Sequence, residues 1–136
     1  MDTTGLAATR KLAADTGTKA RLHTVQVNIA DETSVREAVA AALAALGGGL
    51  DVLVNAAGIL RSSHTHETSL EQFNQVIAVN LTGTFLMIRE TIPALLRGEN
   101  PAVVNFSSTS ASFAHPYMAA YAASKGGIQA MTHALA

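Results

Sequence analysis

The chain has 136 residues, of which 49% are hydrophobic and 14% charged, with a net charge of −1 at pH 7. This length suits one modest domain with its own core. The near-neutral charge without a basic block argues against nucleic-acid binding, and no stretch resembles an uninterrupted membrane span. The absence of cysteine excludes disulfides and thiolate metal sites. The start, Met1–Gly5, lacks signal-peptide features, so we expect a cytoplasmic protein.

The first part of the chain predicts alternating helices and strands. Residues 4–15 carry a weak apolar stripe that predicts a helix, and Leu22–Asn28 alternates apolar and polar residues as a strand does. A clearer helix follows. Its apolar stripe consists of Val35, Ala38, Val39, Ala42, Leu43 and Leu46. Ser34 and Glu37 predict a capping box at its start, and glycines 47–49 predict its end.

The second part continues the alternation. Leu50–Val54 and Ala102–Phe106 predict strands buried on both faces, as in parallel sheets. A long helix is predicted between them, ending at about Leu96, with Pro93 kinking or shortening its end. Its buried face would carry Phe73, Val76, Ile77, Leu81, Phe85 and Ile88. A last helix would run from about Tyr117 to the end. The order α-β-α-β-α-β-α favours a parallel sheet with helices on both faces.

Tyr121, Lys125 and Ser108 are candidates for acid–base chemistry. Tyr121 and Lys125 are four residues apart, so on a helix they lie on one face. A lysine cation beside a phenol favours the phenolate form, which makes tyrosine a usable base. Ser108, thirteen residues before Tyr121, could hold a substrate oxygen near the phenol. The pair alone is more often a solvated face or an incidental cation–π contact.

Polar or small residues follow each predicted strand, at Asn28–Ile29, Asn55–Gly58 and Asn105–Ser108. Ligands of open parallel sheets bind outside the carboxyl ends of the strands, and small residues let a ligand approach the backbone closely. Asn55 could equally serve a turn. Asn80 falls on the apolar stripe of the long helix, where a buried amide needs partners. It either satisfies backbone groups at a local distortion or holds a water that relays protons toward Lys125.

Four segments together resemble the short-chain dehydrogenase/reductase family. They are Val54–Ile59, Val79–Gly83, Val103–Ser108 and Tyr121–Lys125. Each is weak alone, but their order and spacing are specific. The first is similar to the Asn-Asn-Ala-Gly segment that ends the family's fourth strand, with Ala56 replacing the second Asn. The resemblance implies a partial Rossmann-like three-layer α/β/α fold with a parallel sheet, and a single partial NAD(P)-binding domain over residues 1–136.

The resemblance also implies an NAD(P)-dependent oxidoreductase that interconverts a secondary alcohol and a ketone. Tyr121 would move the hydroxyl proton, Lys125 would favour the phenolate and bind the nicotinamide ribose, Ser108 would position the substrate oxygen, and Asn80 would support the proton relay. NAD or NADP would contact Asn28, Ile29, Asn55, Ala56, Ala57, Gly58, Tyr121 and Lys125. Asn28 stands where the family usually has an Asp that contacts adenine, which implies a weakened contact.

The partners implied by the resemblance are a small alcohol or ketone and, for the parent protein, further copies of itself. The long helix and the last helix form the interface of relatives, which implies a homodimer or homotetramer. His115 lies in the loop that borders substrate in the family. His64, His66 and Glu67 could suggest a metal site, but a polar loop without a third ligand favours a solvated loop and no metal. His133 is interpreted as structural.

One family feature is absent from the sequence: a Gly-rich turn after a first strand, which would cradle the cofactor pyrophosphate. By the resemblance, Met1 falls just past the second strand and Ala136 falls inside the catalytic helix, so the preference for NAD or NADP cannot be read. The strand order 3-2-1-4-5-6 would leave Leu22–Asn28 to pair directly with Leu50–Val54 or to stand apart with unpaired backbone. Two alternatives stay open: a non-catalytic truncated fragment, and a Rossmann-like binding or scaffold module without turnover.

Overall fold

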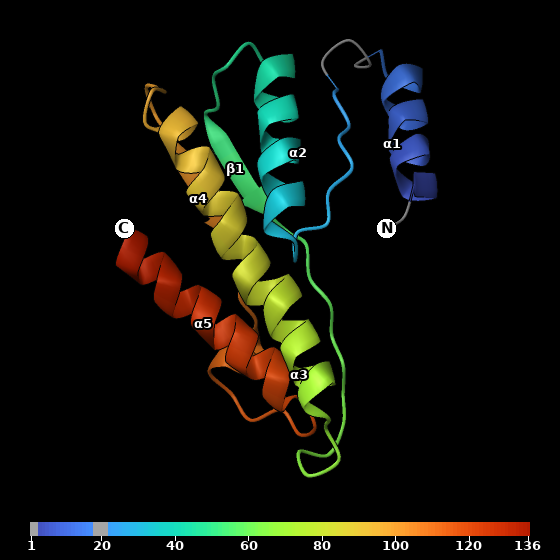
Figure 1. Ribbon diagram of the computed structural model, residues 1–136, viewed down its shortest axis with the longest axis vertical. Coiled ribbons are helices and arrows are strands. Elements are labelled where there is room, and N and C mark those ends of the chain that lie inside the picture. The colour runs from blue at the N-terminus through green and yellow to red at the C-terminus, as the bar shows by residue number, and fades with distance from the viewer. Residues whose placement is uncertain (1–2, 18–21) are drawn as a thin grey trace.

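The computed structural model describes residues 3–17 and 22–136 and has an α/β fold, as the sequence predicts (Figure 1). Its elements in chain order are α1 (Thr3–Asp15), α2 (Glu32–Ala45), β1 (Val52–Asn55), α3 (Leu70–Ile77), a π-helical turn η2 (Ala78–Thr82), α4 (Gly83–Leu95), β2 (Ala102–Asn105), a short 3₁₀ helix η3 (Thr109–Ala111) and α5 (Ala119–Leu135). The strands β1 and β2 are parallel, with Val52 opposite Ala102 and Asn55 opposite Asn105. None of the described helices is both long and apolar enough to cross a membrane.

Helix α4 is the centre of the packed part of the molecule. On one side, Leu86 of α4 packs against Val35 and Val39 of α2. On another, Ile88 and Leu95 of α4 pack against the sheet, through Leu53 of β1. Both clusters are buried and exclude water from apolar surface, which is the main source of stability in such a fold.

The boundaries of α2 differ in part from the prediction. The helix begins after Asp31, whose carboxylate accepts a hydrogen bond from the Ser34 amide at 2.6 Å. The predicted capping box of Ser34 and Glu37 is therefore wrong, since Ser34 lies inside the first turn and its hydroxyl accepts from the Asn28 amide at 2.9 Å. The predicted end at the glycines is confirmed, because Gly47 has φ +76°, a left-handed conformation that commonly ends helices.

The predicted long helix is interrupted. Helices α3 and α4 are separated by the π-helical turn η2, which shifts the apolar stripe around the helix because it holds an extra residue per turn. Val76 and Ile88 are buried as predicted, but Phe85 is 45% exposed. The prediction for Phe85 was wrong because an uninterrupted 3.6-residue period was assumed. Pro93 lies within the last turn of α4, which ends at Leu95.

The strand predicted over Leu22–Asn28 is not formed. The sheet within the described residues contains β1 and β2 alone, so residues 22–28 stand apart. Val27 and Ile29 nevertheless pack against the cluster between α2 and α4, and the Asp31 amide donates to the Asn28 carbonyl at 3.1 Å. The segment therefore has the apolar pattern of a strand and is anchored at its end, but it has no neighbouring strand to complete a ladder.

One face of the sheet is open, which contradicts the prediction that both strands are buried on both faces. Val52, Val54 and Val104 are each more than 40% exposed, whereas Leu53 on the opposite face is buried beneath α4. Helix α1 lies apart from the packed helices (Figure 1), and among its described residues only Leu6 and Ala13 are partly buried. Within the described residues, α4 and α5 pack on the Leu53 face of the sheet.

We predict that the isolated chain self-associates through this open face, because contiguous exposed apolar surface and unpaired strand edges favour association. Thermal unfolding followed by circular dichroism should be broad and should shift with protein concentration. Replacing Val54 and Val104 together with Thr should reduce self-association in sedimentation experiments, whereas Leu12→Thr on the separate helix α1 should not. A sharp, cooperative and concentration-independent transition of the unmodified chain would contradict the prediction.

Candidate active site

Asn80 lies in the π-helical turn η2 and is fully buried. Its Oδ1 accepts a hydrogen bond from the Ile59 amide at 2.8 Å. Its Nδ2 donates to the Ile59 carbonyl at 2.9 Å and to the Ser124 hydroxyl at 3.0 Å. The side chain therefore binds the loop after β1 to helix α5. π-Helical turns recur at functional sites, and this one places an amide in an otherwise apolar helix face.

Ser124 continues this network into helix α5. It is fully buried, and its hydroxyl donates to the Tyr121 carbonyl at 2.7 Å. The sequence interpretation missed Ser124 as a functional residue. A small polar residue three positions after Tyr121, on the inner side of a helix, is the signal that could have identified it as a partner for a buried amide.

Lys125 is only 7% exposed and extends toward the end of β2. Its Nζ donates to the Phe106 carbonyl at 2.7 Å and lies 5.7 Å from the centre of the Tyr121 ring. Burial lowers the pKa of Lys125 below the usual value for a lysine, because a desolvated ammonium is less stable than a hydrated one. Tyr121 and Lys125 therefore share one end of α5, as their spacing predicts.

Gly58 allows the loop after β1 to approach this group. A Cβ at position 58 would lie 3.3 Å from Asn80 Oδ1 and 3.9 Å from Lys125 Nζ. Ala56 and Ala57 before it are exposed. The backbone of this loop is thus accessible beside the lysine, which fits the small residues that the sequence places there.

Ser108 follows β2 and caps the 3₁₀ helix η3. Its Oγ accepts from the Ser110 amide at 3.2 Å, so its own hydrogen remains to be donated to another group. The preceding Ser107 donates to the Lys125 carbonyl at 3.1 Å, which joins the end of β2 to α5. Ser108 thus lies two residues from the carbonyl that binds Lys125 Nζ.

Asn55 makes a cross-strand contact. Its Nδ2 donates to Asn105 Oδ1 at 2.9 Å, and Asn105 Nδ2 donates to the Thr132 hydroxyl at 3.0 Å. Because β1 and β2 are in register here, the two amides pair at the carboxyl ends of both strands. This pair and the link to α5 were not predicted, because the sequence does not show which residues are opposite each other.

Asn28 and Ile29 lie on a different part of the molecule. Asn28 Oδ1 accepts from the Ala30 amide at 3.2 Å in a turn before α2. Ile29 packs against Gly83, where a Cβ would lie 2.8 Å from the Ile29 carbonyl oxygen. The described contacts of these two residues are therefore with α2 and α4, and not with the group around Lys125.

The histidines of the loops near the site contact aromatic or polar neighbours. His64 is in edge-to-face contact with Tyr117, with ring centres 4.6 Å apart. His66 Nε2 lies 3.9 Å from Glu67 on the exposed surface. His115 is bonded to the Thr109 hydroxyl at 3.2 Å. Within residues 3–17 and 22–136, no group of three or more His, Cys, Asp or Glu side chains is arranged to hold a metal.

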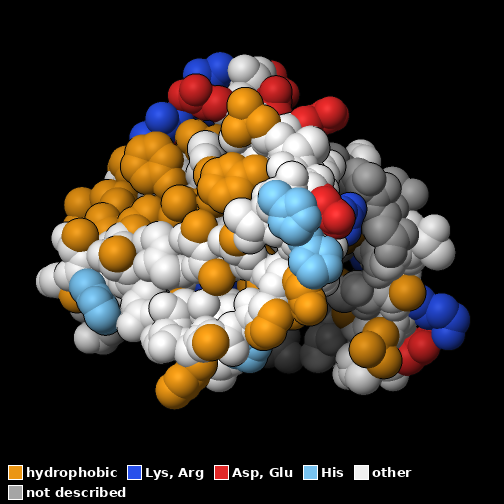
Figure 2. Space-filling model, turned by 90° about the horizontal axis from the view of Figure 1, so that it is seen from below, with side chains coloured by type: hydrophobic (Ala, Val, Ile, Leu, Met, Phe, Trp, Pro, Cys, Tyr) orange, Lys and Arg blue, Asp and Glu red, His pale blue; other side chains and the backbone are white. Residues whose placement is uncertain are grey.

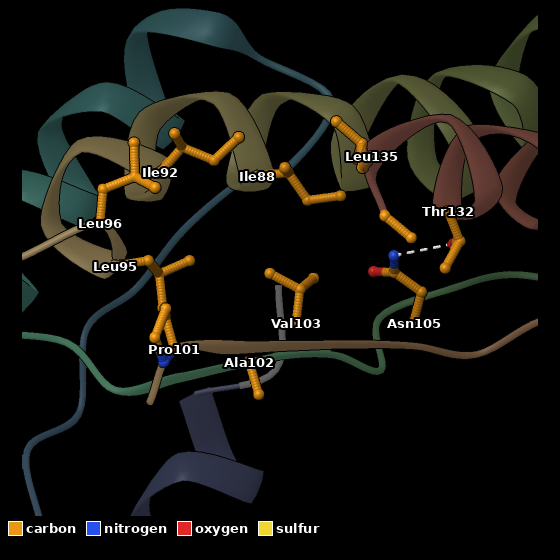
Figure 3. Close-up of a pocket in the computed structure, with 11 residues that line it drawn as sticks. Ile88, Ile92, Leu95, Leu96, Pro101, Ala102, Val103, Asn105, Thr132 and Leu135 are labelled. Carbon is orange, nitrogen blue, oxygen red and sulfur yellow. Dashed lines mark hydrogen bonds between the residues drawn. The ribbon is translucent and has the colours of Figure 1, made fainter. Parts of the chain in front are cut away.

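An apolar pocket of about 380 Å³ lies away from this group, between α4, β2 and the end of α5 (Figure 3). Ile88, Ile92 and Leu95 line one wall and Val103 faces them from β2, with the Asn105–Thr132 hydrogen bond at one end. Tyr121, Lys125 and Ser108 are not among its lining residues. The pocket is therefore a gap between the helices α4 and α5 and the strand β2, and not the site of the candidate chemistry.

The sequence profile of the family described as short chain dehydrogenase matches residues 3–136. The chain therefore belongs to the short-chain dehydrogenase/reductase family, as the four segments predicted. Its relatives include an inactive 2-(S)-hydroxypropyl-CoM dehydrogenase 2 of Xanthobacter autotrophicus, with 38% identity over 96% of this chain and 55% of the relative. D-Threitol dehydrogenase of Mycolicibacterium smegmatis is 39% identical over 80% of this chain and 42% of the relative.

Solved structures agree with this assignment. A Sinorhizobium meliloti protein assigned to the short-chain alcohol dehydrogenases superposes with a TM-score of 0.90 at 29% identity, over 99% of this chain and 52% of its own. The aldohexose dehydrogenase of Thermoplasma acidophilum gives a TM-score of 0.79 at 28% identity, over 82% of this chain and 44% of its own. The chain thus spans about half the length of the relatives it matches.

We predict that Asn80→Ala weakens the fold locally and globally. The change leaves the Ile59 amide and carbonyl and the Ser124 hydroxyl without their partner, and buried unsatisfied groups cost about 1–3 kcal/mol. The urea midpoint in dilute solution should fall clearly. Asn74→Ala, on the exposed surface of α3, is the matched control and should change stability by less than about 0.5 kcal/mol. Equal urea midpoints for the two variants would show that the Asn80 hydrogen bonds do not stabilise the fold.

A second prediction concerns Lys125 and pH. Because the folded chain holds the pKa of Lys125 below its ordinary value, the unfolded chain binds more protons between those two values, and stability rises with pH through that range. Lys125→Met removes this titration. The urea midpoint of the unmodified chain, relative to that of Lys125→Met, should therefore increase from pH 8 toward pH 10. A constant or falling difference would mean that the lysine is not desolvated.

Proposed function

We propose that the chain carries the catalytic group of an NAD(P)-dependent oxidoreductase that interconverts a secondary alcohol and a ketone. The single observation that supports this most is the contact series that joins all four segments: the Gly58–Ile59 loop to Asn80, Asn80 through Ser124 to the Tyr121 turn, and Lys125 to the Phe106 carbonyl. Residues far apart in sequence converge at the carboxyl ends of two parallel strands, where such sheets bind ligands.

In alcohol oxidation, Tyr121 would accept the hydroxyl proton as the carbinol carbon loses a hydride and becomes a carbonyl carbon. Lys125, held beside the ring, would favour the phenolate that this step requires. Ser108 would donate its free hydrogen to the substrate oxygen. Asn80 would support the transfer of the proton to solvent, by holding the geometry of the loop and of α5. Reduction of the ketone is the reverse sequence.

The nicotinamide, when bound, supplies or accepts the hydride. The open backbone of Asn55–Gly58 and the amine of Lys125 would bind the nicotinamide ribose. Glycine suits position 58, because a Cβ there would lie 3.3 Å from Asn80 Oδ1. Asn28 and Ile29 remain proposed contacts on the adenine side. We treat residues 1–136 as a single partial cofactor-binding domain, and propose that the whole protein is a cytoplasmic homodimer or homotetramer that acts on a small alcohol or ketone with NAD or NADP.

A non-catalytic role is the second candidate. It is favoured by the name of one relative, an inactive dehydrogenase. Such a fragment or scaffold would keep the fold of the catalytic group without turnover. Binding of NADH or NADPH to the purified chain, followed by cofactor fluorescence, would argue against a non-catalytic fragment. Alcohol oxidation by the completed chain would argue against a binding or scaffold module without turnover.

The test of the proposed function is Tyr121→Phe in the chain completed with the flanking segments of the D-threitol dehydrogenase relative. Oxidation of secondary alcohols, followed as formation of reduced nicotinamide, should fall by roughly 10²–10⁴-fold while NADH binding is retained. Asn74→Ala, on the exposed surface of α3, is the control and should retain turnover. Unchanged oxidation by Tyr121→Phe would refute the acid–base role.

A further inference from the structure

Tyr117 has an unusual backbone conformation. Its φ is +67°, and among the described residues no other non-glycine has a positive φ. The left-handed region costs a non-glycine residue about 1–2 kcal/mol, and for a bulky side chain it is a genuine outlier. Such conformations persist only where the surroundings over-determine them, and they cluster at functional sites. Tyr117 is therefore held in place by something specific.

Two contacts hold Tyr117. The Ser63 amide donates to the Tyr117 carbonyl at 2.9 Å, and the His64 ring meets the Tyr117 ring edge to face, with centres 4.6 Å apart at 77°. Edge-to-face pairs contribute about 0.5–1.5 kcal/mol beyond burial, which is comparable to the strain. We call Ser63, His64 and Tyr117 the loop clasp, because they join the loop after β1 to the loop after β2.

The loop clasp lies on the loops that carry the candidate chemistry. The loop after β1 passes through Ile59, which is bonded to Asn80. The loop after β2 carries Ser108 and leads through Tyr117 into α5, whose first turn carries Tyr121. If a substrate carbonyl lies between Ser108 and Tyr121, the rest of the substrate extends along these two loops. The clasp is then the part of the protein positioned to contact it.

The exposed chemistry of these loops is largely apolar and aromatic. Tyr117 is 55% exposed, and Leu60 and Phe113 on the same two loops are 42% and 70% exposed. Figure 2 shows hydrophobic side chains gathered beside histidines on this end of the molecule. His64 itself is exposed and offers a ring surface beside that of Tyr117.

The charged groups on the loop after β1 have partners outside the clasp. Arg61 donates to the Leu60 carbonyl at 3.1 Å, and Glu67 lies 3.9 Å from His66. Ser63, His64 and Tyr117 themselves carry no fixed charge, and the His66 ring lies 5.5 Å from the His64 ring, centre to centre. A surface of this kind suits an uncharged apolar group better than a carboxylate or phosphate.

We propose that Tyr117 and His64 form a specificity-determining rim that binds the non-reacting part of the substrate, and that this part is an uncharged aromatic or alicyclic ring. The proposal rests on the proposed function, because that function places the reacting carbonyl between Ser108 and Tyr121. A rigid ring is favoured over a flexible chain of equal size, since it loses less conformational freedom when it lies against the two rings.

The two tyrosines and the absence of tryptophan make a direct test available. Tyr121→Phe leaves Tyr117 as the only tyrosine, so fluorescence reports on the rim alone. Cyclohexanol and 2-hexanol have the same number of carbons, and neither absorbs where tyrosine is excited. Titration of the dilute protein should give a saturable change, with cyclohexanol binding roughly three-fold or more tightly than 2-hexanol. Equal affinities would overturn the proposal.

Variants at position 64 test whether the His64 ring is needed for the preference for cyclohexanol. In the Tyr121→Phe background, His64→Ala should bring the affinity ratio to roughly one, because the ring pair is lost. His133→Ala, which removes an exposed imidazole in the last turn of α5, is the matched control and should keep the preference. His64→Phe should also keep it, which guards against a loss caused by misfolding. A preference that survives His64→Ala, or that His133→Ala abolishes equally, would overturn the proposal.

The fluorescence titration contains no nicotinamide and measures no turnover, so its result does not depend on whether the proposed function is correct. A ring preference in a completed chain that fails to oxidise alcohols would remove the proposed function and leave the rim as a binding site. Alcohol oxidation by the completed chain without a ring preference would leave the function and remove the rim.

Discussion

The hydrogen bonds of the Asn80 side chain are the constraint on which the rest of the site depends. One buried side-chain amide forms hydrogen bonds with the backbone N–H and C=O of Ile59 and with the hydroxyl of Ser124. In a low-dielectric interior such a satisfied network is strong, and a partly satisfied one is costly. The loop after β1, the π-helical turn and α5 are therefore fixed relative to one another. Lys125, through the Phe106 carbonyl, extends the same constraint to the end of β2.

The contacts that hold the candidate site are separate from many of the contacts that stabilise the fold. The helices that carry Asn80, Tyr121 and Lys125 pack on one face of the sheet, while Val52, Val54 and Val104 remain exposed on the other. The structure superposes almost completely on a relative of about twice its length. The elements thus occupy the relative positions they have in a larger fold. A catalytic group can be well assembled by local contacts even where the sheet that supports it is open.

The sequence predicts local features well and pairing poorly. The stripe of α2, the strand around Leu53 and the grouping of Tyr121 with Lys125 follow from spacing along one element. The alternation of Leu22–Asn28 shows that the segment is able to form a strand, but not that a neighbouring strand exists. Asp31 and Ser34 can both cap a helix, and only the backbone conformation decides between them. Asn80 bonds backbone groups at a local distortion, which is one of the two alternatives for this buried amide. The sequence does not show that its partner is Ile59, 21 residues away.

Amide hydrogen exchange at Ile59 shows whether the Asn80 side chain holds the loop after β1. Its amide lies in a loop, yet it donates to the fully buried Asn80 side chain at 2.8 Å. The account predicts that this amide is protected to the same degree as the amide of Lys125 within α5, while that of its neighbour Leu60 exchanges rapidly. Exchange of Ile59 as fast as that of Leu60 would show that the loop is not held by Asn80, and would contradict the account.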